Sequence, residues 1–299
     1  MSDATTSSAY RELLEELREI SVLGSIGGLL SWDQETMMPP RGVGLRAQQA
    51  SMISELVHRR ATDPRVEELL SAAEADPVLR VDGEAAANLR EIRRSLDRAR
   101  KLPTSLVKEL SETSSRAVQI WREAREKSDF AMFAPWLEKI FELSRARADC
   151  LGDGTPAGRY DALMDDYEPG MRAAEVERIF AGLREQLVPL IAGIAGSGRA
   201  PGTRLQSLRI PIPEQVEFNR MVAGRIGFDL DAGRLDVSTH PFCQGLGPGD
   251  TRLTTRYRED AFFDALSSTL HEAGHGLYCL LYTSPSPRDL STSRMPSSA

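Results

Sequence analysis

Residues 262–278 read FFDALSSTLHEAGHGLY and contain the most informative pattern in the chain, His271-Glu272-Ala273-Gly274-His275. Positions i and i+4 share one face of an α-helix, so two histidines at that spacing can bind one metal ion together. The glutamate after the first histidine projects to the side of that face, where an attacking water molecule would lie. The pattern predicts a zinc site with His271 and His275 as ligands and Glu272 as the catalytic base.

The sequence before the motif favours a helix that buries one side. Apolar residues recur at helical spacing, and acidic residues gather at the N-terminal end, where the helix dipole favours them. These residues are Phe262, Phe263, Ala265, Leu266 and Leu270, with Glu259, Asp260 and Asp264. The alternative is a pair of histidines that only decorates an amphipathic helix. The chain has four histidines in all, so a chance H-E-x-x-H has odds below about one in a hundred.

The character of the sequence changes after Tyr278. Residues 279–289, CLLYTSPSPRD, correspond to one reading frame of a transposase adapter used in sequencing libraries, and residues 293–299, SRMPSSA, match a flow-cell sequence. We therefore interpret residues 279–299 as a non-native, disordered tail and leave them out of the fold prediction. The alternative is a natural tail rich in serine and proline. Residues 1–278 are then the incomplete N-terminal part of a single helical domain.

The composition narrows the class of protein. The 299 residues carry a formal net charge of −7, and the tail alone contributes two arginines and one aspartate. Residues 1–278 therefore carry a net charge of −8. This acidic balance argues against a nucleic-acid partner. Only Cys150 and Cys243 precede the tail, which favours a reducing compartment. Without a signal-peptide pattern or an expected membrane-spanning stretch, we predict a soluble, cytoplasmic protein with no membrane partner.

Helical periodicity covers most of the chain before residue 200. We expect helices over residues 10–30, 46–60, 63–75, 82–101, 103–127, 130–151, 173–195 and 213–227, the seventh bent at Pro189. Strand-like alternation is confined to residues 235–240 and 251–257, with a turn-rich segment between them. We expect one antiparallel β-hairpin next to the H-E-x-x-H helix, where a substrate backbone could pair as an added strand. The fold class is therefore mainly α.

Further segments carry a resemblance to a known family. They are Trp32-Asp33-Gln34-Glu35-Thr36, Tyr160-Asp161-Ala162-Leu163, Asp166-Tyr167-Glu168-Pro169-Gly170, His240-Pro241-Phe242 and Asp250-x-Arg252-x-Thr254-Thr255-Arg256-Tyr257. Together with the H-E-x-x-H motif, they make the chain resemble the carboxypeptidase Taq family of metallocarboxypeptidases. The matching segments are spread from about residue 10 to Tyr278, and each is weak alone.

The resemblance implies a helical metallopeptidase with a deep groove that holds the metal. It also implies removal of single C-terminal amino acids from peptides with broad specificity, and a homodimer for the full-length protein. The family's third metal ligand is a glutamate in a His-Glu-Ser segment, which we expect beyond the truncation. By resemblance, His240, Asp250 and Arg252 are groove residues that bind substrate.

Several roles stay open at this stage. His240 is either a group that stabilises the oxyanion or orients substrate, or a structural histidine of the hairpin. Arg252 and Arg256 can bind the terminal carboxylate of a substrate, or can form ion pairs with Asp236 or Asp250. The acids beside Trp32 are expected to have a capping or packing role, and His58 is expected at an exposed helix end.

Two rival functions remain. The two-histidine motif suits a zinc endopeptidase as well as a carboxypeptidase, and a chain without its third ligand can be a catalytically inactive fragment that only makes interactions. The metal is also open, because two imidazoles suit Co²⁺ as well as Zn²⁺.

Overall fold

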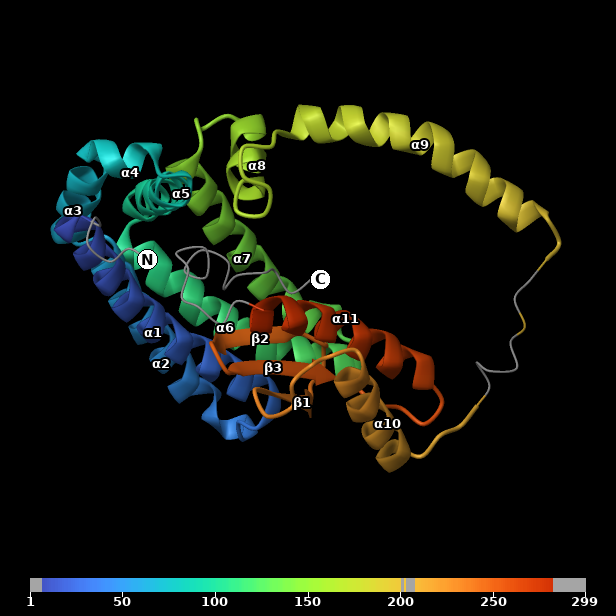
Figure 1. Ribbon diagram of the computed structural model, residues 1–299. Coiled ribbons are helices and arrows are strands. Elements are labelled where there is room, and N and C mark those ends of the chain that lie inside the picture. Colours follow the sequence, from blue (N-terminus) through green and yellow to red (C-terminus); the bar gives the residue numbers. More distant parts are fainter. Residues whose placement is uncertain (1–6, 200–201, 203–207, 282–299) are drawn as a thin grey trace.

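The computed structural model describes residues 7–199, 202 and 208–281, and in this part the chain is mainly helical with one small sheet (Figure 1). The helices are α1 (Ser8–Thr36), α2 (Val43–Ala61), α3 (Pro64–Ala75), α4 (Pro77–Val81), α5 (Gly83–Arg100), α6 (Thr104–Lys127), α7 (Phe130–Leu151), α8 (Pro156–Met164), α9 (Ala173–Gly196), α10 (Ile212–Arg225) and α11 (Phe262–Leu281), with a 3₁₀ turn at Pro40–Gly42. The mainly α fold class is confirmed, and α4 and α8 are additions that the sequence did not predict.

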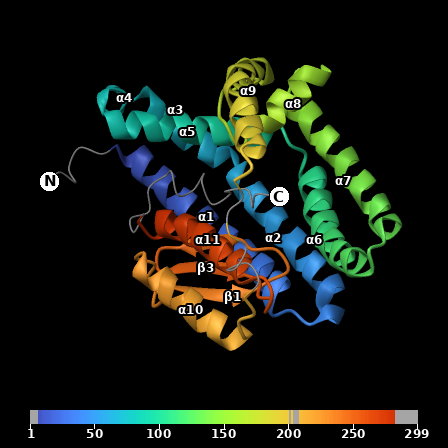
Figure 2. The same cartoon turned by 90° about the vertical axis from the view of Figure 1, so that its right-hand side faces the viewer.

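The long helices form a layer in which each packs on the next. Helix α1 lies against α2, α2 against α6, and α6 against α7 (Figures 1 and 2). Ion pairs and hydrogen bonds fasten the end of α1 to this layer. Gln34 exchanges hydrogen bonds with Ser115 of α6, since its Nε2 donates to the carbonyl oxygen at 2.9 Å and its Oε1 accepts from Oγ at 2.6 Å. Both residues are buried, so these bonds lie in a low-dielectric environment where they hold strongly.

A second core joins the start of α1 to the shorter helices α3, α4 and α5. Each of these three helices begins with an aspartate cap followed by proline or glycine. Asp63, Asp76 and Asp82 accept hydrogen bonds from backbone N–H groups of the first turn of α3, α4 and α5 respectively. Such caps satisfy donors that have no partner inside the helix. The apolar side chains between them are Tyr10, Leu13, Val66, Leu69, Leu70, Ala73, Leu79, Ala85, Leu89, Ile92 and Leu96.

The sheet has three strands, β1 (Gly233–Val237), β2 (Cys243–Gly247) and β3 (Asp250–Thr255), in the order β1-β3-β2. Strands β1 and β3 are parallel, with Leu235 opposite Leu253, and β2 is antiparallel to β3. The expected antiparallel pairing of residues 235–240 with 251–257 is therefore wrong, although a hairpin does precede α11. Its strands are β2 and β3.

The missed strand has a physical explanation. Strand β2 reads Cys-Gln-Gly-Leu-Gly, and its two glycines give no alternation and low strand propensity. Tertiary pairing overrides that propensity. The loop before β2 is fixed by Ser238, whose Oγ donates to the carbonyl oxygen of His240 at 2.6 Å and is 2.7 Å from Oγ1 of Thr254. This loop reverses the chain direction, so that β2 pairs with the edge of β3 opposite β1.

The sheet lies between α1 and α11. Helix α11 packs on β3 and β2, α1 contacts β2, and α10 lies beside α11 (Figure 2). The core between α11 and the sheet consists of Ala223, Phe228, Leu253 and Ala273. Helix α11 ends at Leu281, so the first three residues of the predicted tail are helical. Residues 282–299, the rest of that tail, lie outside the described residues.

Helix α9 extends away from the other helices (Figure 1), and its closest neighbouring element is α8. None of its residues is buried. By length and composition α9 is apolar enough to cross a membrane. This finding corrects the expectation that no stretch of the chain reaches that length. One such helix is weak evidence for a membrane protein, because core helices pass the same test.

His58 differs from its prediction as well. It lies in the last turn of α2, but it is 9% exposed rather than solvated. Burial lowers the pKa of its imidazole, and a hydrogen bond to the backbone of Leu102 opposes part of that effect. The side chain therefore packs α2 against the connection between α5 and α6.

The buried His58 predicts a pH dependence of stability. The unfolded chain takes up a proton near the ordinary pKa of about 6.5, whereas the folded chain resists it, so the free energy of unfolding falls as the pH falls through that value. The His58→Gln variant keeps a donor but cannot titrate, and it should lose less stability between pH 7.5 and 5.5 in urea denaturation. The other three histidines are present in both proteins. Equal losses in the two proteins would contradict the prediction.

Candidate metal and catalytic site

The two histidines of α11 converge on one point. The Nε2 atoms of His271 and His275 are 3.2 Å apart, and the two rings are 4.9 Å apart between centroids at an interplanar angle of 80°. Two nitrogen ligands at about 2.0–2.1 Å from a tetrahedral ion are about 3.3 Å from each other. Burial, followed by the charge of His271, lowers the pKa of His275 and so favours the neutral form that binds metals. The pair therefore fits one small divalent cation.

Glu272 lies on the same helix, but its side chain is buried, with 6% exposed. Burial raises the pKa of its carboxyl group, and the nearby charges of His271 and His240 partly oppose that rise. A carboxylate that has lost its water shell is a better proton acceptor than a solvated one. Its burial next to His271 is compatible with the predicted role as a base, which stays a prediction.

A close approach to the sheet fixes how α11 is rotated. Gly276 faces Phe228 and Leu253, and a β-carbon at this position would lie 2.6 Å and 2.9 Å from their side chains. Ala273 is fully buried on the same side. The Thr255 hydroxyl at the end of β3 donates to the carbonyl oxygen of Ala265 at 3.3 Å. Because this side of α11 packs on the sheet, His271 is turned outward and is exposed.

His240 lies in the loop between β1 and β2, close enough to Glu272 for their charges to interact. Its Nδ1 is 2.7 Å from the carbonyl oxygen of Pro241. A carbonyl only accepts, so Nδ1 carries the proton and the neutral ring presents Nε2 as an acceptor. Donation to an oxyanion therefore requires the imidazolium form. The local bond agrees with a structural histidine, and among the described residues no hydrogen bond is seen for Nε2, which leaves a role in substrate binding open.

The ion-pair interpretation of Arg252 is confirmed. Its Nε and Nη2 atoms each donate to a carboxylate oxygen of Asp250 at 2.9 Å. Asp236 pairs instead with Arg234. Among the described residues, no ion pair or hydrogen bond is seen for the side chain of Arg256, which is partly buried just after β3. Arg256 is therefore freer than Arg252 to bind a carboxylate.

The sequence did not predict that Trp32 contacts these arginines. The guanidinium groups of Arg252 and Arg234 lie 4.3 Å and 5.0 Å from the centroid of its buried ring. Arg234 and Arg252 are also directly opposite each other on β1 and β3. Like charges at such positions repel, and the ring face together with the two aspartates offsets that repulsion. Nothing in the sequence pointed to this contact of Trp32 with the two arginines.

The acids beside Trp32 have the packing role that was expected. Asp33 accepts from Arg46 of α2 at 2.6 Å, and Glu35 pairs with Arg122 of α6. They join the end of α1 to the neighbouring helices. Neither acid lies in a cluster that could hold a metal in the described part of the chain.

Cys243 is a neighbour of Glu272 that the sequence did not identify. A hydrogen bond with Cys279, burial, and the charges of Cys279 and Glu272 raise the pKa of its thiol. A thiol with a raised pKa is a poor nucleophile and a poor metal ligand at neutral pH.

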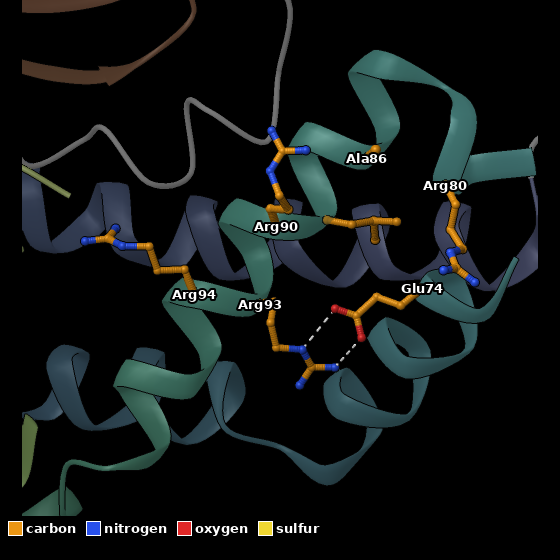
Figure 3. A pocket seen from close by; sticks show the side chains of 7 residues that line it. Glu74, Arg80, Ala86, Arg90, Arg93 and Arg94 are labelled. Atoms are coloured by element: carbon orange, nitrogen blue, oxygen red, sulfur yellow. Dashed lines mark hydrogen bonds and ion pairs between the residues drawn. The ribbon is translucent and has the colours of Figure 1, made fainter. Parts of the chain in front are cut away.

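The described residues supply two candidate metal ligands but no third. No group of three histidine, cysteine, aspartate or glutamate side chains that could hold a metal is found in residues 7–199, 202 and 208–281. Two surface hollows, of about 440 and 350 Å³, lie elsewhere. Figure 3 shows the larger one, lined by Glu74, Arg80, Ala86, Leu89, Arg90, Arg93 and Arg94. Neither includes a residue of α11, so neither is the groove that was expected at the metal.

Comparisons with known proteins agree with this geometry. Residues 12–286 match the family described as Carboxypeptidase Taq (M32) metallopeptidase. The match includes the first eight residues of the segment that we interpret as an adapter, residues 279–286. The chain is 43% identical over 282 residues to thermostable carboxypeptidase 1 of Thermus thermophilus, and 33% identical over 269 residues to carboxypeptidase 1 of Bacillus subtilis. These alignments cover 92% and 90% of the chain but 55% and 53% of the relatives.

Solved structures show the same relation. The BsuCP crystal structure superimposes with a TM-score of 0.85 at 31% identity, over 91% of this chain and 54% of that one. The M32 carboxypeptidase from Deinococcus radiodurans R1 gives 0.77 at 35% identity, over 91% and 54%. Pyrococcus furiosus carboxypeptidase, in a structure described as Apo-Mg, gives 0.79 at 34% identity, over 93% and 56%. The chain thus spans about half the length of the relatives it matches.

Two glycines of the motif helix provide a matched test of the packing. Gly276→Ala should lower the free energy of unfolding by about 1–3 kcal/mol, because the new methyl group has no room against Phe228 and Leu253. Gly274→Ala meets nothing within 4 Å and should raise it by about 0.5–1 kcal/mol through better helix propensity. Urea denaturation measures both. If the two variants behave alike, α11 does not pack as described.

Proposed function

The chain belongs to the carboxypeptidase Taq (M32) metallopeptidase family, and from that premise we propose that it is part of a metallocarboxypeptidase that hydrolyses the C-terminal bond of peptides. The observation that carries the proposal is the pair of Nε2 atoms 3.2 Å apart beside a buried carboxylate. This arrangement offers two ligands for a metal and a base within one turn of helix. The relatives' names, which all contain carboxypeptidase, support cleavage at the C-terminus.

Zinc is the metal we propose. Imidazole nitrogen suits Zn²⁺ and Co²⁺, whereas Mg²⁺ prefers oxygen ligands in octahedral geometry. His271 and His275 would hold the ion, with a glutamate from outside the described residues as the third ligand. When bound, such an ion supplies a Lewis acid that polarises the scissile carbonyl and lowers the pKa of a water molecule.

Glu272 would move the proton during hydrolysis. Its carboxylate takes a proton from the attacking water as the new C–O bond forms, and gives it to the nitrogen of the departing amine as the C–N bond breaks. The raised pKa of the buried carboxyl supports both steps, because the group must hold the proton between them. Such positioned proton transfer accelerates reactions by about 10²–10⁴-fold.

The groove residues would then orient the peptide. His240 can accept an N–H group of the substrate through Nε2, since its Nδ1 is held by Pro241. Asp250 and Arg252 are held rigidly by their ion pair, and Arg252 also packs on the ring of Trp32. Such fixed residues are better suited to line the groove than to bind the terminal carboxylate. Arg256 is the better candidate in this chain for binding the terminal carboxylate. An arginine fork is the group that binds a carboxylate with two parallel hydrogen bonds.

Other properties of the longer protein stay predictions. We propose broad specificity for the C-terminal residue, peptide substrates, a homodimer and a cytoplasmic location, with no nucleic-acid or membrane partner. A zinc endopeptidase is the rival activity, because the motif is compatible with both. An inactive fragment is the second alternative for the 299-residue chain itself, and the missing third ligand among its described residues favours it.

The test uses the longer protein, in which native sequence takes the place of residues 279–299. Glu272→Gln should lower kcat for a peptide with a free C-terminus by about 10²–10⁴-fold and leave the zinc content, measured by atomic emission, unchanged. His275→Ala should lose zinc together with activity. Glu259→Gln is the matched control, since this exposed acid precedes α11 and pairs only with Arg209 among the described residues.

Two results would contradict the proposal. Full activity in Glu272→Gln would exclude its role as the base, and the absence of stoichiometric metal would exclude a metallopeptidase. A peptide with an amidated C-terminus separates the rival activities. A carboxypeptidase leaves it intact, whereas an endopeptidase cleaves it.

A further inference from the structure

Helices α10 and α11 lie side by side (Figure 2) and run in the same direction. Near their starts, Nε2 of Gln215 in α10 donates to the carbonyl oxygen of Arg258, four residues before α11 begins, at 2.9 Å. Farther along both helices, Ala223 and Ala273 belong to one core. Residues in the middle of α10 therefore lie against the first half of α11.

Each of the two helices has a row of three side chains that are fully buried and recur at intervals of four residues. These side chains are Gln215, Asn219 and Ala223 on α10, and Ala265, Thr269 and Ala273 on α11. Residues at this spacing share one side of a helix. The alanines suit a close approach of the two helices. The three polar side chains need hydrogen-bond partners, because burial removes them from solvent.

One oxygen atom of each polar side chain has no hydrogen-bond partner in the part of the chain that the structure describes. The atoms are Oε1 of Gln215, Oδ1 of Asn219 and Oγ1 of Thr269. The orientations of both amides are fixed by their nitrogen atoms. Nε2 of Gln215 donates to the carbonyl oxygens of Ile210 and Arg258 at 2.7 and 2.9 Å, and Nδ2 of Asn219 donates to that of Gln215 at 2.9 Å. An amide oxygen cannot replace these donors, so both amide oxygens are acceptors that need a donor.

The hydroxyl group of Thr269 cannot satisfy both acceptors, because it has only one proton to donate. A water molecule has two. It can donate to both amide oxygens and accept from the hydroxyl group, and these are the three hydrogen bonds that a buried water typically makes. A monovalent cation would leave the hydroxyl proton without an acceptor and would add an unpaired charge to a buried region. Water therefore fits the donors and acceptors of this site better than an ion.

We propose that Gln215, Asn219 and Thr269 bind one buried water molecule between α10 and α11, and that this water fixes the turn of α11 before the H-E-x-x-H motif. Thr269 is two residues before His271. Gly276 packs on the sheet directly after the motif, so α11 is held on both sides of its candidate ligands. Asn219 and Thr269 are thus positioning residues. The effect on metal binding rests on the proposed function, whereas the water site itself rests on the fold.

A high-resolution crystal structure of the longer protein tests the water site. One water molecule should lie within hydrogen-bond distance, about 3.2 Å or less, of all three side-chain oxygen atoms. A direct hydrogen bond from Thr269 to either amide, with no water between the helices, would overturn the proposal. So would a water molecule that contacts only one of the three oxygen atoms. This measurement needs no variant, so it decides the water site even if a substitution prevents folding.

Zinc affinity of the longer protein, measured by competition with a chelator, tests the positioning role. Thr269→Val keeps the shape of the side chain but removes its donor, and should raise the dissociation constant for zinc by about tenfold or more. Thr269→Ser keeps the hydroxyl group and should stay close to the unmodified protein. Thr113→Val is the matched control, because it makes the same change at a buried threonine of α6. It should leave the zinc affinity unchanged.

The possible failures can be told apart. Unchanged zinc affinity in Thr269→Val would overturn the positioning role, even with the water present in the crystal structure. Equal losses of affinity in Thr269→Val and Thr269→Ser would also overturn it, because the hydroxyl group would then not be the cause. If the longer protein binds no zinc, the proposed function and the positioning role fail together, and the crystal structure still decides the water site.

Discussion

The contact of α11 with β3 at Gly276 is the constraint on which the rest of the site depends. A glycine at this position lets the helix approach Phe228 and Leu253 more closely than any other residue would. This approach sets the rotation of α11 about its axis, and so decides that Glu272 is buried while His271 is exposed. The exposure of the motif's side chains therefore depends on the packing of the residue that directly follows it. The sheet in turn is held to the helical layer through α1, whose Trp32 lies against two arginines of β1 and β3.

Much of the fold follows from local sequence, and the exceptions are two short helices and the direction of strand pairing. Periodicity predicted the long helices, and aspartate caps mark the starts of α3 and α5. Helices α4 and α8 have five and nine residues, too few for periodicity, although Asp76-Pro77 and Thr155-Pro156 are capping signals that could have revealed them. The parallel direction of β1 and β3 depends on a return of the chain through β2, which local alternation cannot encode.

The site was predictable to a similar degree. The i, i+4 spacing implied that two imidazoles meet on one side of a helix, and the Nε2 atoms are indeed 3.2 Å apart. Spacing could not show that Arg252 is held by Asp250, that the Nδ1 atom of His240 is bound to its own loop, or that Cys243 lies near Glu272. These are contacts between segments far apart in the sequence or set by the conformation of a loop. The roles of these residues in binding substrate remain predictions.

The placement of both histidines on adjacent turns links metal affinity to the order of the helix itself. An ion held by His271 and His275 would tie two turns of α11 together, close to its last described residue, Leu281. Part of the binding free energy would then go into keeping those turns helical. Loss of the ion would loosen the two turns that carry His271 and His275, because the sheet holds this part of the helix mainly through Ala273 and Gly276. Amide hydrogen exchange in residues 271–278 would therefore report metal occupancy without any substrate.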